Sequence, residues 1–364
     1  MTPTGPAILP DGAIGKPSNK NTRTGLEIQT TYTLSEANTL VGGLTYEKME
    51  QYDVKYSANV LYTPVQNVLI PLPAVEDLTD TQNYNKDVSR TFKAVFLEDL
   101  WDIKKNLRLT VGARYDDYSD FGSSFNPRAG VIWEFLKGYD AKLLYGRAFR
   151  APSFYELYSQ NNPAFVGNPD LKPEKIDTYE LSLGAELTDA LSGRITGFRN
   201  TVNDSVEAVT IAGTRMFQNT SKIRSQGIEA EVKYDFGKGI YVGANYTYQD
   251  VKNLDTDERL WNVPEHKGNL LANIRLSRYF NVLTDVYLQG KYTREPGDPR
   301  EDNDGFTIVN TTLIAKDFLK GLEIRGSVYN LFDTEYTFPT AKDTLPVDFP
   351  MPGRSFMVEV RYKF

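Results

Sequence analysis

Cysteine is absent from this chain of 364 residues, and histidine occurs once, at His266. Without cysteine, neither a disulfide framework nor a cysteine-ligated metal site is possible, and one histidine cannot form a histidine-cluster metal centre. Runs of about twenty apolar residues, the length of a transmembrane helix, are also missing. The net charge of −7 argues against nucleic acid as a partner. A soluble protein or a membrane β-barrel remains.

The N-terminal segment lacks the features of a signal peptide. Met1 to Pro17 has no basic start and no apolar run, whereas an exported barrel requires such a leader. If the chain is a barrel, we therefore expect a further N-terminal part. Residues 1–21 are rich in Pro, Gly, Asn and Thr and are predicted to be irregular.

Aromatic residues are abundant, and apolar and polar residues alternate strictly in several segments. The 23 Tyr and 19 Phe suit the aromatic girdles of a membrane barrel. In residues 354–364, Glu359 and Arg361 share one parity, and the other parity holds Phe356, Val358, Val360, Tyr362 and Phe364. Successive side chains of a strand face opposite sides, so one face is apolar and the other charged. Half-buried strands of soluble proteins also alternate, but recurrence at 107–116 and 228–236 favours a barrel with lipid outside and a polar lumen.

The same pattern predicts about fifteen strands, and hence an all-β chain. They are expected near 22–35, 39–56, 88–102, 106–118, 125–136, 139–149, 174–187, 191–204, 222–235, 239–252, 266–278, 282–293, 306–316, 321–331 and 354–364.

The connections between these segments alternate in length. Short turns are predicted near 36–38, 103–105, 137–138, 188–190, 237–238, 279–281 and 317–320. Long loops are predicted near 57–87, 150–173, 205–221, 253–265, 294–305 and 333–353, with a shorter one at 119–124. Outer-membrane barrels have short periplasmic turns and long extracellular loops. Counting back from a periplasmic end at residue 364, residues 1–21 fall in an extracellular loop. An odd number of strands that starts outside predicts the C-terminal portion of a larger barrel.

Two motifs border the loop at 150–173. Residues 145–152 are Tyr-Gly-Arg-Ala-Phe-Arg-Ala-Pro, and residues 167–174 are Gly-Asn-Pro-Asp-Leu-Lys-Pro-Glu. Near the C-terminus, residues 329–333 are Tyr-Asn-Leu-Phe-Asp, followed by Pro352-Gly353-Arg354 and an aromatic last strand. From about residue 22 onward, the chain resembles TonB-dependent outer-membrane receptors.

The resemblance implies a transmembrane antiparallel barrel of the 22-stranded, plugged type in the bacterial outer membrane. Such receptors bind a scarce ligand outside, commonly a ferric siderophore, haem or cobalamin, and a TonB box ahead of the plug energises uptake. Residues 1–21 resemble neither a plug nor a TonB box, so residues 22–364 are expected to be the C-terminal barrel portion. The implied partners are a ferric siderophore or similar chelate, outer-membrane lipid, TonB through the missing N-terminal region, and the barrel-assembly machinery through the C-terminal strand.

Candidate ligand contacts lie at the loop end. Arg147 and Arg150 are expected near the lumen mouth, where they could attract anionic ligands. The loop aromatics could stack on a siderophore; they are Tyr155, Tyr158, Phe165, Phe217 and Trp261. The alternative is that Arg150, Pro152 and Asn168 only shape the strand–loop–strand corner, and that the aromatic rings pack the loops.

Other groups of residues give weaker indications of function. His266 could bind haem, but it fits an ordinary histidine at a loop edge, and residues 153–167 hold no histidine for haem. The acidic clusters 255–258 and 301–305 match no complete calcium loop. With one histidine and no partner motif, no catalytic residue, metal or cofactor is expected, so an outer-membrane enzyme is the weaker rival. A passive porin or adhesion barrel is the other rival, although a porin is not expected to carry the paired motifs.

Overall fold

The computed structural model describes residues 12–63, 68–162, 165–211 and 214–364. In this part of the chain, sixteen strands form one sheet. They are β1 (Gly15–Ser35), β2 (Asn38–Thr63), β3 (Val68–Asp77), β4 (Val88–Lys104), β5 (Leu107–Tyr118), β6 (Gly122–Leu136), β7 (Tyr139–Arg150), β8 (Glu174–Glu186), β9 (Leu191–Ile211), β10 (Thr214–Gly237), β11 (Ile240–Asn253), β12 (His266–Arg275), β13 (Phe280–Gln289), β14 (Phe306–Lys316), β15 (Leu322–Tyr329) and β18 (Ser355–Tyr362). Two short helices, α1 (Thr79–Gln82) and α2 (Phe154–Tyr158), and the small β16–β17 pair (Thr337–Phe338 and Phe349–Pro350) lie in the connections.

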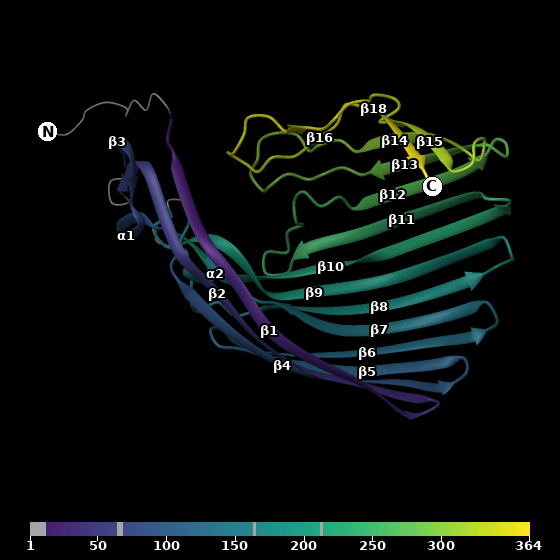
Figure 1. Cartoon of the computed structure of the whole chain (residues 1–364), viewed down its shortest axis with the longest axis horizontal. Helices are drawn as coiled ribbons and strands as arrows, with labels where there is room; N and C mark the ends of the chain where they lie inside the picture. Colours follow the sequence, from purple (N-terminus) through teal and green to yellow (C-terminus); the bar gives the residue numbers. More distant parts are fainter. Residues whose placement is uncertain (1–11, 64–67, 163–164, 212–213) are drawn as a thin grey trace.

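The main sheet is an antiparallel meander. Its path is β1-β2-β4-β5-β6-β7-β8-β9-β10-β11-β12-β13-β14-β15-β18, so each long strand pairs with its neighbours in the sequence, and β3 branches from β2. The prediction of an all-β chain with about fifteen strands is confirmed. The sheet curves strongly and stays open, because β1 and β18 form its two edges in the described chain (Figure 1).

The two faces of the sheet differ in chemistry. On one face, large apolar side chains lie exposed along strand after strand; Val358 in β18 is 74% exposed. On the other face, polar side chains are buried: Asp116 is 1% exposed, and Ser124 and Asn126 pack beside it. We call these the apolar and the polar face. In β18, Glu359 is in register with Arg325 on the polar face, while Phe356, Val358, Val360 and Tyr362 share the apolar face; the fifth predicted residue, Phe364, follows the strand, with its ring centroid 5.0 Å from that of Tyr362. This arrangement is inverted relative to a water-soluble sheet and suits lipid outside.

Three segments differ from the sequence prediction. β1 begins at Gly15, so residues 15–21, predicted irregular, are strand; residues 1–11 of that predicted segment lie outside the described residues. The pairing of Gly15 with Ala58 extends the β1–β2 ladder, and Pro17 is tolerated because β1 is an edge. Likewise, the predicted loop 205–221 is largely the end of the β9–β10 hairpin, and the predicted loop 57–87 contains the end of β2, all of β3 and α1.

The long and the short connections lie at opposite ends of the strands. The long ones, with α1, α2 and β3, gather at the left of Figure 1, and the short turns lie at the right. The predicted alternation is therefore present in space. No helix in the described residues has the length and apolarity needed to cross a membrane.

Candidate functional site

The corner after β7 is built around Arg150. Its two Nη atoms bind the carboxylate of Glu156 at 2.9 Å each, and its Nε binds Glu174 at the start of β8. Ser153 caps α2 by accepting the backbone N–H of Glu156, whose carboxylate accepts the Ser153 N–H in return. Burial alone would raise the pKa of Glu156, but the hydrogen bonds from Arg150 and Ser153 lower it. Arg150 therefore joins two strands and a helix.

A second arginine, which the sequence analysis did not single out, anchors the same corner. Arg90 binds Asp120 through Nε and Nη2 at 2.8–2.9 Å and donates from Nη2 to the Pro152 carbonyl at 2.8 Å. Its side chain is 6% exposed, and its guanidinium stacks over the rings of Phe121 and Phe154. A buried ion pair is costly to break by removing one partner, because the other charge is left without its counter-ion. No sequence signal links Arg90 to Pro152, 62 residues away.

The second motif closes the loop onto α2. The N–H of Asn168 donates to the Glu156 carbonyl at 2.8 Å, and its side-chain amide donates to the Phe217 carbonyl in β10 at 3.0 Å. Gly167 lies so close that a Cβ there would be 2.5 Å from the Ser159 nitrogen. Leu157 is buried beneath this turn at 1% exposure. Both motifs thus shape the strand–loop–strand corner.

The predicted loop aromatics divide into three sets. Tyr155, Phe165 and Phe217 form one cluster, with ring centroids 5.0–6.1 Å apart, and Tyr155 stays 39% exposed. Tyr158 lies apart from them, with Lys86 over its ring at 4.8 Å and its hydroxyl directed at Asp120. Trp261 lies in the β11–β12 connection and belongs to neither set. The structure thus brings together three of the five predicted aromatic side chains, Tyr155, Phe165 and Phe217.

The β13–β14 and β15–β18 loops form a second unit. Arg294, in the β13–β14 loop, binds Asp348, in the β15–β18 loop, through two hydrogen bonds. Arg300 binds Asp298 and the hydroxyl and carbonyl of Thr340. Beneath them, four aromatic side chains pack together: Tyr292, Phe306, Tyr336 and Phe338. Burial raises the pKa of Tyr292 to about 12.

The predicted position of Arg147 at the lumen mouth is wrong. Arg147 binds Asp177 at 2.9 Å, and the hydroxyl of Tyr145 donates to the same carboxylate. Tyr145 is in register with the exposed Tyr179, so all of these side chains lie on the apolar face. Arg147 and Arg150 are three residues apart in one strand, and alternation therefore places them on opposite faces.

His266 and the acidic clusters have ordinary partners. His266 Nδ1 lies 2.6 Å from the Tyr246 hydroxyl on the apolar face, beside the ring of Tyr248. In the cluster 301–305, Asp302 accepts the backbone N–H of Arg294 at 3.1 Å. In the cluster 255–258, Asp255 accepts the backbone N–H of Lys222 at 2.8 Å. Each cluster thus accepts a backbone N–H of a neighbouring segment.

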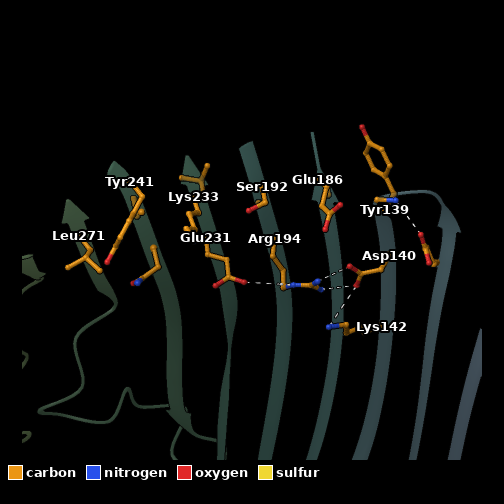
Figure 2. A pocket seen from close by; sticks show the side chains of 18 of the residues that line it. Tyr139, Asp140, Lys142, Glu186, Ser192, Arg194, Glu231, Lys233, Tyr241 and Leu271 are labelled. Carbon is orange, nitrogen blue, oxygen red and sulfur yellow. Dashed lines mark hydrogen bonds and ion pairs between the residues drawn. The ribbon is translucent and has the colours of Figure 1, made fainter. Parts of the chain in front are cut away.

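The polar face carries a charge network toward the short-turn end. Figure 2 shows side chains from adjacent strands that line a pocket of about 880 Å³ there. Arg194 in β9 binds both oxygens of Asp140 in β7 at 2.8 and 3.0 Å, across the intervening β8. β8 supplies Gly184 at the crossing, where a Cβ would lie 2.5 Å from Asp140 Oδ1. The pocket lies at the opposite end of the strands from the aromatic cluster, and both apolar and charged side chains line it.

Comparison with known proteins identifies the scaffold. The sequence model described as TonB dependent receptor-like, beta-barrel matches residues 4–331. Among solved structures, the chain is similar to the ferric-catecholate import receptor Fiu from E. coli K12, at 18% identity and a TM-score of 0.71, with 95% of this chain and 55% of that one covered.

The siderophore receptor PirA from Acinetobacter baumannii gives 19% identity and a TM-score of 0.76, with 95% and 55% covered. The copper transporter OprC gives 17% and 0.73, with 95% and 56% covered. The chain thus spans little more than half the length of these structures. At these identities the structural matches establish the fold alone; the neighbours are described as an import receptor, a siderophore receptor and a transporter, and not as enzymes. Because the family match covers most of the sequence, the chain belongs to the TonB-dependent receptor β-barrel family.

Proposed function

We propose that this chain is the C-terminal β-barrel portion, residues 22–364 with the preceding strand segment, of a bacterial outer-membrane receptor that takes up a ferric siderophore. Members of the family are outer-membrane transporters, and Fiu and PirA are described as receptors for ferric chelates. TonB acts through the part of the receptor that precedes this barrel. The long loops then lie outside the cell and the short turns in the periplasm.

The observation that carries this proposal is the partly exposed aromatic cluster at the loop end. Tyr155 and Phe165 lie in the β7–β8 connection and Phe217 lies in the β9–β10 hairpin, and together they form one surface beside the corner built around Arg150. Flat aromatic rings suit a chelate with aromatic or extended planar groups. Exposed Lys86, over the Tyr158 ring, adds positive charge for an anionic chelate.

The experiment is ligand binding by the intact protein purified from outer membranes. A ferric catecholate, a ferric hydroxamate, haem, cobalamin and a copper salt are each titrated against intrinsic fluorescence. We expect saturable binding of one ferric siderophore and an increase of its Kd by about tenfold in Tyr155→Ala and in Phe217→Ala. Tyr32→Ala, which truncates an exposed ring on the apolar face of β1, is the matched control.

Three results would contradict the proposal. Saturable binding of haem or cobalamin in place of every siderophore would assign a different ligand. Binding of no ligand, together with passive ion conductance in planar bilayers, would favour a porin or adhesion barrel. Unchanged affinity in both loop variants would move the site away from this cluster.

A further inference from the structure

The apolar face carries a basic band at the level where its exposed tyrosines end. Four strands, β8 to β11, align their side chains in rungs here. Of the three rungs described here, the one farthest from the long loops is apolar and consists of Leu181, Gly197, Ile228 and Tyr248. Toward the long loops, the next rung is Tyr179, Arg199, Gln226 and Asp250, and the one after it is Asp177, Thr201, Arg224 and Lys252.

A groove of about 560 Å³ runs along this part of the face. Leu181 and Tyr179 line one side, and Ile228 and Tyr248 line the other. Gly197 lies between them, and a Cβ added there would meet no atom within 4 Å, so the missing side chain opens the groove. The apolar lining of the groove suits a lipid chain.

Two arginines at the loop end of the groove lack partners within the described residues. The guanidinium of Arg199 makes no hydrogen bond or ion pair, and the buried Nε of Arg224 has none either. Pairing of Arg199 with Gln226, and of Thr201 with Arg224, puts the two arginines on adjacent strands one rung apart. A guanidinium group carries five N–H donors, so one without a partner in the protein can bind an anionic group.

The carboxylates nearby do not neutralise these arginines. Asp177 is bound by Arg147 at 2.9 Å, and Asp250 is bound by Arg259 at 3.0 Å. Lys252 adds a further positive charge; its nearest carboxylate, Asp257, is 3.5 Å away on an open loop. Every acidic group of the band therefore already has its own cation, and Arg199 and Arg224 remain available.

From this arrangement we infer that the groove binds one phosphorylated acyl lipid of the leaflet at the loop end. An acyl chain lies over Gly197, and the phosphate is held by Arg199 and Arg224, with Lys252 close by. Arginine matches phosphate through paired, charge-assisted hydrogen bonds, and basic pockets on membrane proteins recognise anionic headgroups in this way. The inference rests on the proposed membrane orientation, and it names a site that siderophore recognition does not use.

The test is native mass spectrometry of the intact protein, purified from outer membranes in dodecyl maltoside. The probes are dioleoyl phosphatidic acid, dioleoylglycerol and inorganic phosphate. We expect one phosphatidic acid to be retained, with retention reduced about tenfold or more in Arg199→Gln/Arg224→Gln. Gly197→Leu, which fills the groove and keeps both arginines, should reduce retention as well. Lys93→Gln, which removes an exposed cation from the same face on β4, should not change it.

The alternatives have distinct signatures. Equal retention of dioleoylglycerol would show that the phosphate is not recognised, and equal competition by inorganic phosphate would reduce the site to an adventitious anion site. Unchanged retention in both the double variant and Gly197→Leu would also overturn the inference. Siderophore binding, measured on the same samples, separates the two proposals: its absence with lipid retention intact contradicts the receptor function alone.

Discussion

Arg294 and Asp348 join two loops that lie 54 residues apart, through a pair of hydrogen bonds at 2.9 and 2.6 Å. Both side chains are largely shielded, at 9% and 14% exposure. Asn303 donates to the same carboxylate at 3.0 Å. The loops after β13 and β15 therefore form one platform, and the charge on Asp348 holds it together.

The first prediction is that acid opens this platform. The Arg294 guanidinium holds the pKa of Asp348 well below its usual range, and Arg300 lowers that of Asp298 to about 2. A carboxylate whose pKa is depressed in the folded state contributes stability above its unfolded value of 3.8 and loses it as the pH falls through the folded value. Cleavage of residues 333–353 by pepsin should therefore rise steeply as the pH falls from about 4 toward 2.

Asp348→Asn is the control for this effect. It removes the titrating charge, so the loop should be cleaved readily already at the upper end of that range, with a weaker dependence on pH. Cleavage that rises equally in the variant and the parent would assign the effect to the protease or to the whole barrel.

The second prediction concerns the corner after β7. Arg150→Ala leaves Glu156 and Glu174 facing each other without their shared cation. Because Arg150 is about half exposed, we expect a modest loss of about 1 kcal/mol, confined to the corner. Hydrogen exchange of residues 153–173 should accelerate, while exchange in β8 and β9 stays unchanged. Arg215→Ala, on the β9–β10 hairpin, is the matched control, and equal acceleration there would contradict a local role.

Strand pairing could be predicted from the sequence because the signal is periodic and local. Residues 107–116 and 354–364 alternate over whole strands, and a one-residue slip would turn every apolar side chain to the wrong face. The same rule could have corrected the position of Arg147. Its odd separation from Arg150 in one strand places the two on opposite faces.

The loop contacts could not be predicted in this way. The pairs Arg90–Asp120 and Arg294–Asp348 join distant segments, and neither side chain of a pair carries a local pattern. The start of β1 could not be predicted for a related reason. Pro17 and the Asn-rich residues near it indicate a loop by propensity, yet the long partner strand β2 extends the ladder to Gly15.

The third prediction separates a glycine required by packing from one that leaves a space. Gly167→Ala would place a Cβ 2.5 Å from the Ser159 nitrogen, so the corner must shift, at a cost of about 1–3 kcal/mol. Gly197→Ala meets no atom within 4 Å and should cost less than 1 kcal/mol. Urea-dependent unfolding in lipid vesicles measures both. A larger loss in Gly197→Ala would contradict the packing at the corner.

The last prediction tests which face meets lipid. Val358 is the fourth residue of β18, is 74% exposed and is in register with Gly326, so its side chain has no large neighbour across the strand. An arginine at this position would face hydrocarbon, and near the bilayer midplane it should cost roughly 2–4 kcal/mol. Glu359→Ala, one residue on, removes a half-buried carboxylate that binds Arg361 at 3.1 Å on the polar face. Because that pair is open to water, its loss should cost about 1 kcal/mol or less. Unfolding of the two variants in vesicles gives both values directly. If Glu359→Ala is the more damaging change, the faces of the barrel are assigned in reverse, and the lipid groove between β8 and β11 must face the lumen.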